Sequence, residues 1–288
     1  MLGRPSEFSC FAVLRFPQCC QYDGPSHPGY ANLLAKFQKV GLVVCLVHLA
    51  DVYSYNHVHG EHYLQQFKPF PTKFPGSTLR STAHIVDIVD RGKGVTVKVG
   101  ITTSDASSGE KLCYNEWTSF VRQVPGRGAT PSTAAIIITP PADRAADATL
   151  THQTTHTQSA LYRATTTEWN PMHISPAHAK EGGFHAPILS GSCTIGIGIK
   201  HIIDTFADGD VKRFKSVKLR LSAPVIIGEK VQTEMWVDKE SPSLDGVTRI
   251  IYRQVVVADE LAASKDRIVI NNAVAELWDR VSTPRSRI

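Results

Sequence analysis

A carboxylate and an imidazole lie five residues apart in the most polar stretch of the second half of the chain. Glu168 and His173 flank Pro171, which disfavours a continuous helix and makes a turn between them the expected structure. Such a turn can point both side chains at one water molecule. Hydration needs a base that activates water and an acid that protonates carbon, and a carboxylate with a histidine suits both tasks. The alternative is a loop whose Glu168 and His173 face solvent.

The elements that must position this pair are mostly strands. Apolar residues at 95, 97, 99 and 101 alternate with Thr96, Lys98, Gly100 and Thr102, which is the period of a half-buried strand. A turn at 91–94 makes residues 79–103 a predicted hairpin, and residues 111–122 follow as a strand. In the second half, the strands are predicted over residues 214–222, 229–238, 247–258 and 267–279.

One long helix is predicted over residues 191–206. Its isoleucines and Phe206 cover most of its circumference, and a helix that is apolar nearly all round is buried. A single buried helix wrapped by an antiparallel sheet is typical of the hot-dog fold. Gly196 and Gly198 weaken isolated helicity and would allow close approach of backbone or ligand.

Three short matches in the same order suggest an internal repeat. Two copies of one fold are therefore predicted, although chance similarity between strands remains the alternative. The paired stretches are His59-Gly60 with Ser190-Gly191, residues 76–81 with 228–233, and residues 110–115 with 266–271. The first of these pairs is interpreted as the start of an apolar helical stretch in each half.

Residues 125–160 are interpreted as a linker, because they are rich in glycine and proline and then in threonine, histidine and glutamine. The predicted domains are residues 1–124, residues 161–281 and a tail at 282–288. The net charge of +5 is scattered rather than clustered, which favours an anionic substrate over a nucleic acid. The absence of a run of about 18 apolar residues predicts no membrane span. The six cysteines lack the spacing of a metal site and indicate a reducing compartment.

At several motifs the chain resembles the MaoC-like hydratases, and in particular the type 2 enoyl-CoA hydratases of peroxisomal multifunctional enzymes. In the second half, the resemblance rests on Tyr162-Arg163, Trp169-Asn170-Pro171-Met172-His173-Ile174, Gly183-Phe184, Pro187-Ile188-Leu189, Gly191 and residues 214–225. In the first half, it rests on His59-Gly60-Glu61, Tyr63-Leu64, Pro69, Pro71-Thr72 and Asp90-Arg91-Gly92-Lys93-Gly94.

The resemblance implies an α+β double hot-dog fold, in which each of two repeats wraps an antiparallel sheet around a central helix. The N-terminal repeat would be non-catalytic and would make room for the acyl chain, and the C-terminal repeat would carry the chemistry. The implied reaction is the reversible hydration of trans-2-enoyl-CoA to (3R)-3-hydroxyacyl-CoA. It uses no metal and no redox cofactor.

The family's active-site residues carry over to four positions. Glu168 takes the place of an aspartate, His173 of the histidine and Asn170 of the asparagine. Glu168 and His173 would hold one water for attack at C3 and deliver a proton to C2. The Gly191 N–H, at the start of the buried helix, would donate to the developing enolate oxygen.

Three departures from the family pattern stand out. The family's aspartate is Glu168, whose extra methylene moves the carboxylate by about an ångström. The family's His-Gly at the helix start is Ser190-Gly191. Residues 1–50 match poorly, and a truncated or spliced start of the N-terminal repeat is one interpretation.

Further residues are candidates for binding or structure. Lys218 and Arg220 lie along a predicted strand and suit the phosphates of coenzyme A, although a solvated strand face is the alternative reading. Lys93 is a third candidate for substrate binding. Glu61, with His59 and His62, clusters at the expected first helix, and the resemblance implies that Glu61 organises the interface between the repeats.

The last three residues, Ser286-Arg287-Ile288, resemble a peroxisomal address of the Ser-Lys-Leu type, and without it a cytoplasmic location is expected. The expected partner is an acyl-CoA thioester, with no nucleic acid and no membrane. Whether two chains pair as a homodimer stays open. The alternative functions are a catalytically silent acyl-CoA-binding relative and another thioester enzyme of this fold, such as a thioesterase.

Overall fold

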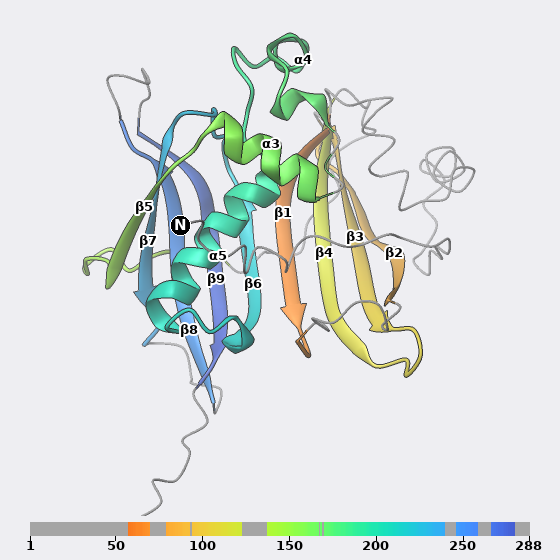
Figure 1. Cartoon of the computed structure of the whole chain (residues 1–288), viewed down its shortest axis with the longest axis vertical. Coiled ribbons are helices and arrows are strands. Elements are labelled where there is room, and N and C mark those ends of the chain that lie inside the picture. Colours follow the sequence, from red (N-terminus) through yellow and green to blue (C-terminus); the bar gives the residue numbers. More distant parts are fainter. Residues whose placement is uncertain are drawn as a thin grey trace, which may run out of the picture.

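The computed structural model describes residues 57–69, 79–92, 94–122, 137–166, 168, 170–239, 246–258 and 266–279. In these residues, nine strands form one antiparallel sheet, and helix α5 (Gly191–Phe206) lies across one face of its C-terminal part (Figure 1). The strands of the N-terminal half are β1 (His57–Gln66), β2 (Leu79–Asp90), β3 (Gly94–Asp105) and β4 (Lys111–Arg122). Those of the C-terminal half are β5 (Ala148–Gln153), β6 (Phe214–Leu221), β7 (Lys230–Val237), β8 (Val247–Val256) and β9 (Arg267–Trp278).

The order of the strands in the sheet reveals the internal repeat. They are arranged as β2-β3-β4-β1-β6-β9-β8-β7-β5, so β2, β3, β4 and β1 on one side mirror β7, β8, β9 and β6 on the other. The two halves join where β1 and β6 pair in antiparallel fashion. The molecule therefore has the double hot-dog architecture predicted from the sequence. In the described part of the N-terminal half, no helix is present.

The predicted strands agree closely with those in the structure, including the hairpin of β2 and β3. One prediction is wrong: His59-Gly60 opens no helix but lies in strand β1, which pairs with β4 on one side and β6 on the other. The ladder bonds on both sides of β1 hold this segment extended, with a register shift at Gly60. The counterpart of β1 in the C-terminal half is β6 rather than the start of α5.

The C-terminal end of the region predicted to be a linker forms regular secondary structure. Its threonine-rich end forms strand β5, which pairs with β7 at the edge of the sheet. Helix α3 (His156–Thr165) follows at once, capped by the Thr155 side chain, which accepts a hydrogen bond from the Gln158 N–H. Polar composition suggested a linker, but an edge strand tolerates polar residues on its solvent side.

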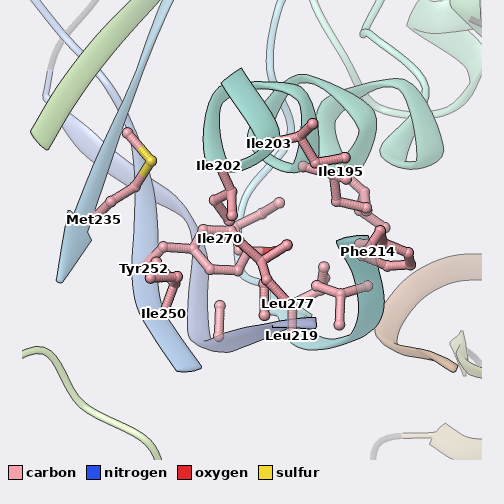
Figure 2. Packing of buried hydrophobic residues seen from close by; sticks show 14 of the residues in the cluster. Ile195, Ile202, Ile203, Phe214, Leu219, Met235, Ile250, Tyr252, Ile270 and Leu277 are labelled. Atoms are coloured by element: carbon pink, nitrogen blue, oxygen red, sulfur yellow. The ribbon is translucent and has the colours of Figure 1, made fainter. Parts of the chain in front are cut away.

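Helix α5 forms the centre of the core, as predicted. Ile195, Ile202 and Ile203 point from α5 toward the sheet, where they pack with Leu219, Tyr252 and other apolar residues of β6 to β9 (Figure 2). Gly198 permits this close packing, because a Cβ at its position would lie 3.2 Å from the amide carbon of buried Gln254. In the described parts of the chain, no helix is long and apolar enough to cross a membrane.

Candidate active site

The predicted turn between Glu168 and His173 is present as a short 3-10 helix, η2 (Pro171–His173). Asn170 caps it, since its Oδ1 accepts a hydrogen bond from the Met172 N–H at 3.1 Å. The Asn170 N–H in turn donates to Glu168 Oε1 at 3.1 Å. The proline and the asparagine therefore build a turn that ties one carboxylate oxygen of Glu168 to the backbone. The role predicted for the Asn170 side chain is thus partly structural.

His173 is buried and held at both its ring and its backbone. Its Nδ1 lies 2.9 Å from the carbonyl oxygen of Ile188, and its own carbonyl accepts a hydrogen bond from the Ser159 hydroxyl at 2.7 Å. Because a carbonyl oxygen can only accept, His173 Nδ1 must carry the proton of this bond. The remaining ring nitrogen, Nε2, is therefore the one that can exchange a proton with water or substrate.

Two short helices frame this turn. Helix α3 supplies Ser159, and helix α4 (Pro176–Glu181) follows η2 directly, with Ser175 as its cap. After α4 the chain returns through Ile188, which forms an isolated bridge with Ile226 and so fixes the carbonyl that meets His173. The histidine thus depends on contacts between segments about fifteen residues apart.

The start of α5 lies beside Glu168. Ser190 is the N-cap residue and Gly191 the first residue of the helix. The Ser190 hydroxyl donates to Glu168 Oε2 over 3.5 Å. The first N–H groups of a helix lack partners within it, and together with the helix dipole they favour negative charge. The structure therefore brings together the turn with Glu168, Asn170 and His173 and the helix start with Gly191.

Side chains of the N-terminal half, His59 and His62 of β1 and Trp117 of β4, form a wall on one side of this site. A Cβ built on Gly191 would lie 3.3 Å from His59 Nδ1 and 3.1 Å from Leu221 Cδ1. The His59 ring stacks on Trp117 of β4, with ring centroids 3.9 Å apart and planes at 10°. His59 Nε2 lies 3.3 Å from Nδ1 of buried His62, whose pKa burial lowers to about 4, so that His62 is neutral at neutral pH. The strand ladder between β1 and β4 builds this wall.

Sequence reasoning missed the wall and one further residue, Tyr162 of α3. Its hydroxyl is close to the side chains of Ser190 and Ser192, and burial is the main reason that its pKa is raised. Tyr162 belonged to the motif that carried the family resemblance, and this was the signal that could have placed it at the site. Nearby Cys193 is free and buried, and burial raises the pKa of its thiol to about 11.

The residues predicted to bind phosphates do not meet at this site. Lys218 and Arg220 are exposed and alternate along β6 with Val217 and Leu219, which pack in the core beneath α5. They therefore lie on the opposite face of the sheet from α5. Contact with coenzyme A would require the substrate to reach that face, and it stays a prediction. Lys93, like Trp169 of the motif, lies outside the described residues.

Glu61 lies in the seam between the halves, and its assignment as an organiser of that interface stays a prediction. It pairs with Arg220 in the antiparallel register of β1 and β6. In the pairing of β1 with β4, a register shift at Gly60 falls between His59 and Glu61. Within the described ranges, no group of three or more histidine, cysteine, aspartate or glutamate residues could hold a metal ion.

The chemistry available to this arrangement is proton transfer next to an anion-stabilising helix start. The Glu168 carboxylate accepts from Ser190 at the start of α5, and the His173 ring bonds to the carbonyl of Ile188, two residues before Ser190. Such a set can move protons at a substrate that develops negative charge on oxygen.

Two family models match the chain. Residues 138–256 match the MaoC like domain, and residues 39–123 match the MFE-2 hydratase 2 N-terminal domain. Among curated relatives, the peroxisomal multifunctional enzyme type 2 of Mus musculus is 40% identical over 62% of this chain and 24% of its own length. The probable enoyl-CoA hydratase 2 of Dictyostelium discoideum is 35% identical over 62% of this chain and 60% of its own length. The chain thus spans less than two thirds of either relative.

Solved structures show the same fold. A MaoC-like dehydratase from Phytophthora capsici superposes with a TM-score of 0.65 at 26% identity, covering 78% of this chain and 72% of that one. A Mycobacterium tuberculosis protein described as having a double hotdog fold superposes with a TM-score of 0.53 at 16% identity, covering 93% of this chain and 84% of its own. The second likeness concerns the fold alone.

Proposed function

Since this chain belongs to the MaoC-like hydratase family, in its type 2 enoyl-CoA hydratase branch, we propose that it reversibly hydrates trans-2-enoyl-CoA to (3R)-3-hydroxyacyl-CoA in fatty acid β-oxidation. The observation that carries the proposal is that Glu168 bonds to Ser190 at the start of α5, while the His173 ring bonds to Ile188 two residues before it. The names of the relatives, which include enoyl-CoA hydratase 2, supply the substrate class.

Glu168 and His173 transfer protons in this reaction, and Gly191 stabilises the negative charge. Glu168 and His173 hold one water, take a proton from it as its oxygen attacks C3, and return a proton to C2. Negative charge develops on the thioester oxygen during the attack at C3, and it is lost when C2 takes up its proton. The Gly191 N–H donates a hydrogen bond to that oxygen at the end of the helix where the dipole favours anions. The product carries the hydroxyl group on C3 and the added hydrogen on C2, and the site returns to its starting protonation state.

The N-terminal half serves the acyl group. It presents His59, whose ring stacks on Trp117, to the start of α5, so an acyl thioester bound at Gly191 meets both halves of the molecule. This arrangement supports the assignment of catalysis to residues 161–281 and of acyl-chain accommodation to residues 1–124. The stretch between the end of β4 and the start of β5 then joins the halves, because the later part of the predicted linker forms β5 of the C-terminal sheet.

A direct assay tests the function. Addition of the protein to crotonyl-CoA should lower the absorbance of the conjugated thioester, and chiral analysis of the product should find the 3R alcohol. Formation of the 3S alcohol would reject the family as a guide to the site's stereochemistry. No loss of absorbance would favour a catalytically silent acyl-CoA-binding relative, and release of free thiol would favour a thioesterase.

The proposed location is the peroxisome. The mouse relative is named peroxisomal, and Ser286-Arg287-Ile288 at the end of the chain has the small-basic-aliphatic pattern of a peroxisomal address. A fluorescent protein fused in front of the chain should give punctate fluorescence that coincides with a peroxisomal marker. Removal of the last three residues should make it diffuse. A diffuse intact fusion would contradict the assignment.

A further inference from the structure

Ser190 is the N-cap residue of α5, but its side chain makes no capping hydrogen bond to the helix. An N-cap serine ordinarily accepts a hydrogen bond from a backbone N–H two or three residues ahead. Ser190 makes no such bond, although it is the N-cap residue of α5 and only 4% of its surface is exposed. Its hydroxyl donates instead to Glu168 Oε2. The side chain is therefore directed to the carboxylate rather than to its own helix.

Tyr162 of α3 lies next to Ser190. Its hydroxyl is close to the side chains of Ser190 and Ser192. The Tyr162 ring packs against the apolar cluster of Leu189, Cys193 and Ile197, which fixes the position of its hydroxyl. The Ser190 hydroxyl thus lies between Tyr162 of α3 and the Glu168 carboxylate, to which it donates.

The two oxygens of the Glu168 carboxylate have different donors. Oε1 accepts from the Asn170 N–H at 3.1 Å, and Oε2 accepts from Ser190 at 3.5 Å. The second contact is long for an O–H···O bond, as catalytic hydrogen bonds often are before substrate binds. A glutamate has one more rotatable bond than an aspartate, so it needs a second fixed point to hold its carboxylate in one orientation.

We propose that Ser190 is the positioning residue of Glu168, and that its hydroxyl lets a glutamate take the place of the family's aspartate. This proposal deepens the proposed hydratase function and rests on it. The two residues at which the site departs from the family pattern, Glu168 and Ser190, are in contact with each other. They therefore form a coupled pair, in which the serine provides the donor that the longer side chain reaches.

The first test compares side-chain positions and needs no activity. In crystal structures of the full chain, Glu168 should contact Ser190 in the wild type. It should leave that position in Ser190→Ala and regain it in Ser190→Thr, which keeps the hydroxyl. Thr205→Ala removes a hydroxyl at the other end of α5 and should leave Glu168 in place. An unmoved Glu168 in Ser190→Ala would overturn the proposal.

The second test measures coupling in the active enzyme. Ser190→Ala should lower kcat about tenfold with little change in KM or in melting temperature, because the hydroxyl acts on the base and not on the helix. Glu168→Asp withdraws the carboxylate from Ser190 and should also lower kcat about tenfold. In the Glu168→Asp background, Ser190→Ala should cost nothing further. An equal loss in both backgrounds would refute the coupling.

The two tests separate this proposal from the function on which it rests. A wild-type protein without activity toward enoyl-CoA thioesters would end the hydratase proposal. The crystallographic comparison would then decide alone whether Ser190 orients Glu168. An active wild type in which the two substitutions are independent would instead retain the function and remove Ser190 from the site.

Discussion

Glu168→Gln is expected to lower kcat/KM for enoyl-CoA hydration by about 100- to 10,000-fold, which corresponds to about 3–5 kcal/mol of transition-state stabilisation. The amide has nearly the shape of the carboxylate but cannot take a proton from water near neutral pH. The amide oxygen can still accept from the Asn170 N–H, and the amide NH2 can donate to the Ser190 hydroxyl oxygen, so the turn should keep its fold. Initial rates with crotonyl-CoA, together with a thermal melt of the variant, measure both expectations.

A matched control for this substitution is Glu110→Gln. Glu110 is an exposed carboxylate of the N-terminal half that pairs with Lys68 at the surface. Its loss should leave both rate and melting temperature nearly unchanged, since exposed ion pairs contribute little. Full activity in Glu168→Gln would show that Glu168 is not the base and that the carry-over from the family's aspartate is wrong.

Periodicity predicted the elements of the fold well. Helix α5 has the predicted bounds, because six apolar residues recurring on nearly every side can be satisfied only inside a core. Strand β4 also has the predicted bounds. The failure at His59-Gly60 has a different cause. Two residues carry no periodicity, and the extended state of β1 is set by β4 and β6, which are distant in sequence.

The sequence predicted the part of the site that lies within one turn. Glu168, Asn170 and His173 are close because Pro171 bends the chain between them. The contacts of His59 with Gly191 and of Tyr162 with Ser190 join distant segments, so spacing could not reveal them. The outward direction of Lys218 and Arg220 was within reach, however. Their alternation with Val217 and Leu219 already placed them on the solvent side of a half-buried strand.

His173→Asn should lower kcat/KM by a similar factor, about 100- to 10,000-fold, and it separates chemistry from folding. The asparagine amide can occupy the place of Nδ1 and donate to the Ile188 carbonyl, so the buried hydrogen bond survives. What disappears is Nε2, the one ring nitrogen left to exchange a proton. The melting temperature should therefore change little while the rate collapses. His178→Asn, at a histidine of α4 that bonds to Ser175, serves as the control and should keep its activity.

The double variant Glu168→Gln with His173→Asn tests whether the two side chains act on one water. Residues that work as a unit lose function together, so the double variant should be little slower than the slower single variant. Independent action predicts instead that the two losses multiply, to at least about 10,000-fold in kcat/KM. Multiplied losses would mean that Glu168 and His173 serve different steps. A rate for His173→Asn close to that of the wild type would leave Glu168 and the start of α5 as the whole of the proton-transfer site.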